Sequence, residues 1–293
     1  MESIRGGTLK MSWRAWPLAV VFHAGETLAG LVCGHHRWCV ALWVAISIGM
    51  VFVAPKPLWA DSDVQTEHSE EQEAGEEVVP PLPYEPTTSY EKRDVRGWLV
   101  LVHKSLVEEH AELGEQVLEL IDFQLYQIAR VVPKPALEKL RQIPIWVEYA
   151  DPRHPCACYH VSRRWLRANG FNPEKAGSVE IANSRRFLEW TRDQPWMLLH
   201  ELAHGYHHRF LGGYGNPEIA AAWKAAMEQG LYDEVLHCRG SRRPAYAKNN
   251  PQEYFAELSE AWFGVNDFYP FVRAEVREHD PKAAELLRRL WGQ

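Results

Sequence analysis

The sequence predicts an α+β fold that is mainly helical and contains a small sheet. Apolar runs at 97–103 and 143–149 and an alternating run at 178–184 are typical of strands. A broad apolar face repeats through 114–132, and the chain after residue 193 is mainly helical in its periodicity. With 293 residues, 46% of them hydrophobic, we expect one folded domain with an appended N-terminus.

Residues 1–60 resemble a secretory signal peptide or an N-terminal anchor. The segment 38–54 is apolar and uncharged, follows the basic Arg37, and precedes the small Ala60, near which cleavage could fall. Its length approaches the ~20 residues of a membrane span, so an uncleaved anchor is an alternative and a buried core helix is another. The long stretch before it leaves a translation start at Met11 or later open. We expect the body of the chain to be secreted or extracytoplasmic, with membrane contact only if this segment is not cleaved.

Residues 61–92 are acidic and Pro-rich, which predicts a solvated linker, and the folded body is expected to span 93–293. Without the N-terminal segment, three cysteines remain: Cys156, Cys158 and Cys238. In an oxidising compartment one of the first two could pair with Cys238, which leaves an odd thiol. The two cysteines of "CAC" lack the spacing of a zinc knuckle, so we do not expect this pair to bind metal.

The charge balance argues against nucleic acid or an anionic membrane surface as a partner. The formal net charge is −7, and residues 1–60 hold five Lys or Arg against two acids, so the remainder has 27 basic and 37 acidic residues, a balance of −10. Binding to phosphates needs the opposite sign. We therefore expect no nucleic-acid partner.

The densest group of reactive side chains lies in "QPWMLLHELAHGYHHRF", residues 194–210. Asp193 is the expected N-cap of a helix, with Pro195 in its first turn, and Gly212 and Gly213 predict its end. One side of the helical wheel is apolar, and it carries Leu198, Leu199, Leu202, Ala203, Tyr206 and Phe210.

His200 and His204 lie on the other side of this helix. They are about 40° apart around its axis, and Glu201 beside them is rotated by about 100°. Two neutral imidazoles at this spacing can bind one Zn²⁺, with the glutamate as general base towards a bound water. His204 and His208 share the spacing, but only the first pair has a glutamate directly after its first histidine. We expect His207 and His208 to be partly exposed or to lie behind the ligands, with direct metal binding as the alternative.

A second helix is expected within "PAYAKNNPQEYFAELSEAWFG", residues 244–264, starting at Asn250 and Pro251. Its apolar face consists of Phe255, Leu258 and Trp262. Three carboxylates fall within about 60° of one another on the opposite side. They belong to Glu253, Glu257 and Glu260.

These carboxylates admit two interpretations. Glu253 stands three residues after Asn250 and could complete a capping box, with Glu257 and Glu260 as a solvated stripe. A zinc site with two histidines, however, lacks a third protein ligand, and a carboxylate from a second helix can supply it. The second interpretation makes Glu253 the third ligand candidate.

The two motifs together resemble the gluzincin metallopeptidases related to the catalytic domain of anthrax toxin lethal factor. In that family HExxH is followed by a Tyr, a Glu seven residues on, two aromatic residues, an Ala and a further Glu; here the second motif is "AYAKNNPQEYFAE", about 50 residues after the first. The similarity covers roughly residues 178–270.

The resemblance implies a zincin-like domain with an HExxH active-site helix and a bound Zn²⁺. Its zinc ligands correspond to His200, His204 and Glu253. Glu201 corresponds to the general base, and Tyr246 to a phenol that faces the developing oxyanion. Glu257 corresponds to a carboxylate that orients a ligand histidine.

The predicted function is that of an exported zinc metallopeptidase acting on a peptide or protein substrate. One alternative is a zinc-binding regulatory or binding module without turnover, although the intact Glu201 favours turnover. Another is a membrane-tethered form of the same hydrolase. The run 178–184 is expected to be an edge strand that pairs with an extended substrate, or a purely structural strand.

Overall fold

The computed structural model describes residues 83–293 and confirms the α+β fold class. This part of the chain forms ten α-helices, a five-stranded mixed sheet and a two-stranded sheet. The expected signal peptide or anchor at 1–60 and the linker up to residue 82 lie outside the described residues. Each helix within 83–293 is too short or too polar to span a bilayer.

The main sheet has the strand order β1-β2-β3-β5-β4. Its strands are β1 (Tyr90–Val95), β2 (Trp98–His103), β3 (Ile145–Val147), β4 (Ala157–Tyr159) and β5 (Val179–Ile181). The three central strands are parallel, and each outer strand is antiparallel to its neighbour. The predicted strands at 97–103, 143–149 and 178–184 are therefore confirmed as β2, β3 and β5.

Two features of the sheet differ from the prediction. The run 178–184 is not an edge strand, because β5 pairs with β3 on one side and with β4 on the other. The edge strand β4 has three residues within a segment whose sequence is otherwise irregular, so its periodicity is too short to detect.

The folded part begins within the segment assigned to the linker, with the 3-10 turn η1 (Thr87–Ser89) and β1. Four consecutive charged residues, 91–94, lie in β1, which is an outer strand whose exposure alternates along its length. The sequence pattern of a linker and that of this strand are therefore alike.

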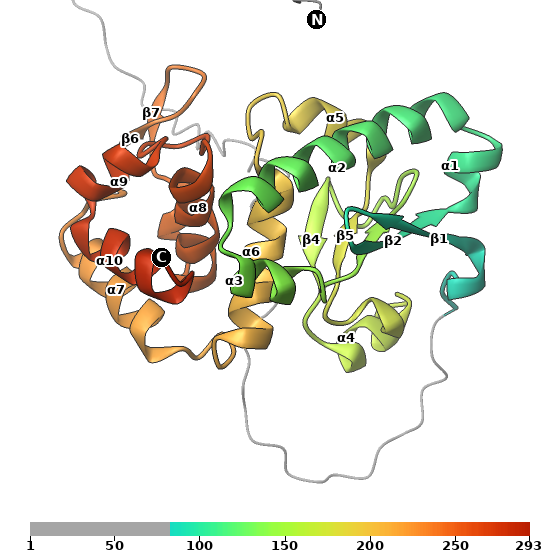
Figure 1. Ribbon diagram of the computed structural model, residues 1–293, viewed down its shortest axis with the longest axis horizontal. Coiled ribbons are helices and arrows are strands. Elements are labelled where there is room, and N and C mark those ends of the chain that lie inside the picture. Colours follow the sequence, from blue (N-terminus) through green and yellow to red (C-terminus); the bar gives the residue numbers. More distant parts are fainter. Residues whose placement is uncertain (1–82) are drawn as a thin grey trace, which may run out of the picture. The chain divides into compact units, whose positions relative to one another are not determined.

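The helices surround the sheet and continue beyond it (Figure 1). In chain order they are α1 (Lys104–Glu108), α2 (Ala111–Val131), α3 (Lys134–Leu140), α4 (Arg163–Ala168), α5 (Ser184–Trp190), α6 (Met197–Phe210), α7 (Pro217–Glu228), α8 (Pro251–Phe263), α9 (Arg273–His279) and α10 (Pro281–Leu290). Two short 3-10 turns are η2 (Pro173–Lys175) and η3 (Tyr246–Lys248). The two-stranded sheet consists of β6 (Val235–Leu236) and β7 (Arg242–Arg243).

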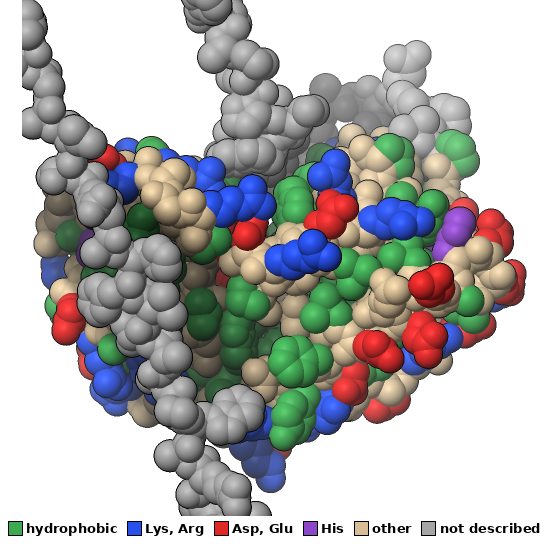
Figure 2. All heavy atoms as spheres, turned by 90° about the horizontal axis from the view of Figure 1, so that it is seen from above, with side chains coloured by type: hydrophobic (Ala, Val, Ile, Leu, Met, Phe, Trp, Pro, Cys, Tyr) green, Lys and Arg blue, Asp and Glu red, His purple; other side chains and the backbone are tan. Residues whose placement is uncertain are grey.

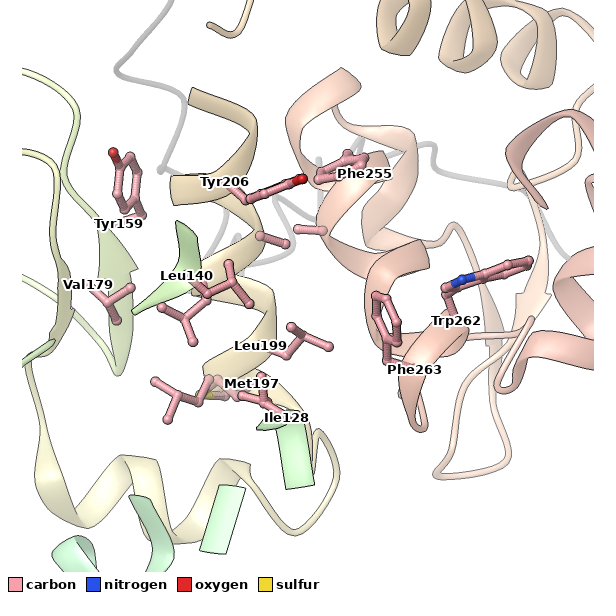
Figure 3. Packing of buried hydrophobic residues seen from close by; sticks show 14 of the residues in the cluster. Ile128, Leu140, Tyr159, Val179, Met197, Leu199, Tyr206, Phe255, Trp262 and Phe263 are labelled. Atoms are coloured by element: carbon pink, nitrogen blue, oxygen red, sulfur yellow. The ribbon is translucent and has the colours of Figure 1, made fainter. Parts of the chain in front are cut away.

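Helix α6 stands between the sheet, with α2 and α3, and the C-terminal helices α7 to α10 (Figure 1). Both of its sides are packed: Figure 3 shows Leu140 and Val179 on the sheet side, and Leu199 and Phe263 towards α8. Gly205 makes the approach to the sheet close, because an added Cβ there would lie 2.7 Å from Cδ1 of Ile143. The predicted histidine helix is therefore the central element of the fold.

The predicted ends of the helices are partly confirmed. Gly212 and Gly213 have φ of +87° and +85° just after α6, as expected of a glycine stop. Asn250 caps α8 by accepting a hydrogen bond from the backbone N–H of Glu253 at 2.8 Å. Asp193 does not cap α6: the helix begins after Trp196, and the Asp193 carboxylate is paired with Arg239.

The three cysteines of the described chain are free. Cys156 is buried and its thiol donates to Sδ of Met197 at 3.4 Å, while Cys238 is exposed. The disulfide considered from the sequence is absent from this part of the structure.

Candidate metal centre

Helices α6 and α8 bring three donor atoms to one point. Nε2 of His200 and Nε2 of His204 are 3.1 Å apart. Oε2 of Glu253 lies 3.1 Å from the first nitrogen and 3.3 Å from the second. The three residues proposed as ligands from the sequence therefore lie together. The Glu253 carboxylate points towards the two histidines and not back to the N-terminus of α8.

The three donor atoms of His200, His204 and Glu253, called the donor triangle below, are spaced like ligands of one metal ion. Ligands bound to zinc at 2.0–2.1 Å with tetrahedral angles lie about 3.3 Å from one another. The donor set of two imidazoles and one carboxylate is that of catalytic zinc sites with an open fourth position. The cluster of His200, His204 and Glu253 is therefore a candidate metal-binding site within the described residues.

The other ring nitrogen of His200 is hydrogen-bonded to Glu260, which lies about two turns after Glu253 on α8. Nδ1 lies 2.8 Å from Oε1 of Glu260, whereas Oε1 of Glu257 is 3.8 Å away. Gln194 donates to the same Glu260 oxygen at 2.8 Å and so fixes the carboxylate. With Nδ1–H donated to Glu260, Nε2 of His200 carries the lone pair that a metal needs. The sequence singled out Glu257 for this contact, and in the structure Glu260 makes it.

The solvated stripe considered from the sequence is absent, since Glu257 and Glu260 are 1% and 0% exposed. Burial raises the pKa of both carboxyls above the ordinary value, and the neighbouring acid Asp267 contributes to this. Burial lowers the pKa of His200, but Glu253 and Glu260 outweigh it and raise the pKa overall. The cluster therefore favours positive charge, whether from protons or from a cation.

Glu201 follows His200 on α6 and is 8% exposed. Burial raises the pKa of its carboxyl, and the two histidines oppose this shift. A carboxylate in such an environment is suited to accepting a proton and releasing it again. Its place beside the donor triangle agrees with the wheel that the sequence predicts.

Two tyrosines flank the site. The ring of Tyr246, in η3, lies 6.4 Å from that of His200, and the side chain is half-buried. Tyr214, in the loop after α6, places its ring 6.4 Å from that of His204. Burial raises the pKa of Tyr214, and Glu253 and Glu201 add to the shift. Sequence reasoning missed Tyr214, because the Gly-Gly pair before it leaves the path of the chain open.

His207 and His208 lie outside the donor triangle. His208 is half-buried, with Nδ1 at 2.9 Å from the Tyr159 hydroxyl. His207 is fully buried against the rings of Tyr214 and Phe255, and both of its ring nitrogens are without a hydrogen-bond partner among the described residues. The expectation of partial exposure is thus met by His208 and not by His207, whose side of α6 faces α8.

In comparisons with protein-family models, with curated proteins and with solved structures, nothing matches this chain.

Proposed function

We propose that this protein is an exported zinc-dependent metallopeptidase that holds its metal with His200, His204 and Glu253. One observation carries the proposal: the three donor atoms lie 3.1–3.3 Å apart, with Glu201 next along the helix that supplies the histidines. The resemblance of the two motifs to the gluzincin peptidases supports the same assignment.

The residues around the metal divide the chemistry of hydrolysis among them. Zinc held by His200, His204 and Glu253 would supply a Lewis acid for the scissile carbonyl and would lower the pKa of a water towards ~7. The Glu201 carboxylate accepts the proton of the attacking water and passes it to the nitrogen of the leaving amine. The peptide C–N bond breaks and the carbonyl carbon forms a new C–O bond to the oxygen of the water, so water is the single co-reactant. The Tyr246 hydroxyl would donate a hydrogen bond to the oxyanion, and Tyr214, whose ring lies beside that of His204, is the second phenol at the site.

The substrate backbone is proposed to lie along β4. This strand is one of the two outer strands of the sheet, pairs with β5 on one side and also contacts α6. An extended peptide can add to such an edge through main-chain hydrogen bonds. This placement replaces the one at 178–184, which the strand order excludes.

A peptide or protein remains the proposed partner, and nucleic acid does not. On the face in Figure 2, Lys and Arg side chains lie among Asp and Glu side chains, instead of forming the continuous basic surface that a phosphate backbone needs. Export is proposed from the apolar segment at 38–54, and a tethered form follows if that segment is retained. Mass spectrometry of the N-terminus of the mature protein separates the two.

The decisive experiment is a peptide-library digest with the purified chain. We expect cleavage that stops with a chelator and returns when zinc is added. The matched control is Glu201→Gln, which keeps the metal ligands and removes the base. A zinc-loaded chain that cleaves nothing in the library would contradict the peptidase and favour the binding module instead.

A further inference from the structure

A second cluster of metal-ligating side chains lies on the face of the sheet opposite α6. Along β5, Val179 and Ile181 point into the main core together with α6, so Glu180 between them points to the other face. Cys158 of β4 is its direct partner in the antiparallel register, which places both side chains on that face. His160, two residues after Cys158, continues on the same side.

The ligand atoms of this cluster converge. One atom each from His154, Cys158, His160 and Glu180 lies within 4.8 Å of all the others. Nε2 of His160 contacts Oε2 of Glu180, and Sγ of Cys158 lies 3.6 Å from the same nitrogen. For bonds of 2.3 Å to sulfur and 2.0–2.1 Å to nitrogen, a tetrahedral zinc would separate sulfur and nitrogen by about 3.5 Å. Binding of one ion by both His160 and Glu180 would replace the direct hydrogen bond between these two side chains.

His154 supplies an independent sign that something is bound here. Its Nε2 is buried and has no hydrogen-bond partner among the described residues. An unpaired buried nitrogen is costly, roughly 1–3 kcal/mol, unless it has a partner such as a metal. The ring lies 5.6 Å from that of His160 and 5.0 Å from that of Phe171, so packing holds it beside the cluster.

The charges around the cluster leave room for a divalent cation. Lys175 bonds Glu148 at 2.6 Å and also contacts Glu180. Two carboxylates therefore face the single ammonium of Lys175, and burial raises the pKa of the Cys158 thiol, so that its charge appears only when a cation displaces the proton. A divalent cation would bring this buried group to neutrality.

From this geometry we propose that His154, Cys158, His160 and Glu180 bind one Zn²⁺ in a closed, four-coordinate structural site. The thiolate and the imidazoles select zinc over magnesium or calcium. On binding, the S–H bond of Cys158 breaks, its proton goes to solvent, and an Sγ–zinc bond forms. The ion would tie the loop 151–156 to β5. The "CAC" spacing gave no hint of this site, because its ligands are one cysteine, two histidines and a glutamate 20 residues after His160.

The two proposed sites can be told apart because one contains a thiolate. Cobalt(II) bound to a thiolate gives a charge-transfer band in the near ultraviolet, and cobalt held by His200, His204 and Glu253 gives none. We expect the full-length chain to bind about two metal ions and to show this band. Cys158→Ser should abolish the band and lower the stoichiometry to about one. Cys156→Ser is the matched control, because that buried thiol contacts Met197 instead, and it should keep both the band and the second ion.

Each result of these titrations either supports or contradicts the proposed zinc site. A wild-type chain without the band, or a Cys158→Ser chain that keeps it, overturns the proposal. His204→Ala should lose one ion and keep the band, so a failure of the catalytic site would leave this site standing. If Cys158→Ser does not fold, His154→Leu replaces it: we expect at least a tenfold weaker affinity for the second ion, whereas unchanged affinity contradicts the proposal.

Discussion

In the proposed mechanism each carboxylate around His200 has a separate role, and the role of Glu201 is to move a proton. Glu201→Gln removes the base but none of the atoms of the donor triangle. We expect the zinc content to stay near that of the wild type and turnover to fall by roughly 10²-fold to 10⁴-fold. Metal analysis and initial rates on a cleaved peptide measure both. Loss of the zinc, or full activity without the carboxylate, would show that Glu201 has another role.

In the proposed site Glu260 orients His200, and the matched comparison is Glu257. Both are buried on α8, but only Glu260 lies at 2.8 Å from Nδ1. Glu260→Gln should weaken zinc affinity by roughly 10-fold to 100-fold, and Glu257→Gln by less. Competition with a fluorescent chelator gives the two affinities. The reverse order would return the orienting role to Glu257, which the resemblance implies.

The two tyrosines test the oxyanion contact. If Tyr246 donates to the oxyanion alone, Tyr246→Phe should lower kcat by ~10² to 10³ and leave KM about unchanged. Tyr214→Phe removes the other phenol near the metal and should change kcat much less. Steady-state kinetics on one peptide compares them. A large loss in Tyr214→Phe together with wild-type turnover in Tyr246→Phe would exchange their roles.

Spacing along one helix predicted the reactive residues of α6, and the resemblance of the second motif added Glu253 of α8. Contacts that depend on how two elements pack were not predicted beyond this one. His200, Glu201 and His204 follow from the spacing along a single helix. The choice between Glu257 and Glu260 depends on how α8 lies against α6, and the helical wheel leaves both on the same side. Cys158 and Glu180 meet across a strand pair that a three-residue strand does not reveal. Longer elements such as α2 and α8 were recognisable because their periodicity extends over several turns.

At the scale of elements, Gly264 lets the end of α8 approach the start of α6. A Cβ at this glycine would lie 1.9 Å from Cε2 of Trp196, far inside contact distance. Gly264→Ala should therefore displace the indole and lower the free energy of unfolding by roughly 3 kcal/mol. Urea denaturation measures the loss.

Gly215 provides the control for this substitution. It has open space around it and no positive φ, so Gly215→Ala should be neutral or stabilise by a few tenths of a kcal/mol. Equal stability of the two variants would mean that the contact between Gly264 and Trp196 is looser than the structure shows.

At the scale of the whole molecule, His207 makes global stability depend on pH. Burial lowers its pKa to about 3, whereas an unfolded chain titrates near ~6.5. The unfolded state therefore binds the extra proton, and the contribution present above about pH 6.5 is lost as the pH falls towards 3. The slope is at most about 1.4 kcal/mol per pH unit.

His207→Leu should remove this dependence together with two unpaired nitrogens. Between pH 7 and pH 5 we expect the wild type to lose about 2 kcal/mol more stability than the variant, measured by urea denaturation at each pH. Parallel losses in the two proteins would show that His207 is protonated in the folded state.

A metal ion bound at the donor triangle would also close part of the chain into a ring. His204 and Glu253 are 49 positions apart, and an ion bound to both closes the stretch between them as a cross-link does. Such a closure restricts the unfolded chain most when the loop is long. The exposed Arg242–Arg243 pair lies inside this ring. A protease that cut there would leave two fragments, each holding part of the donor set, and the ion would keep them joined until a chelator released it.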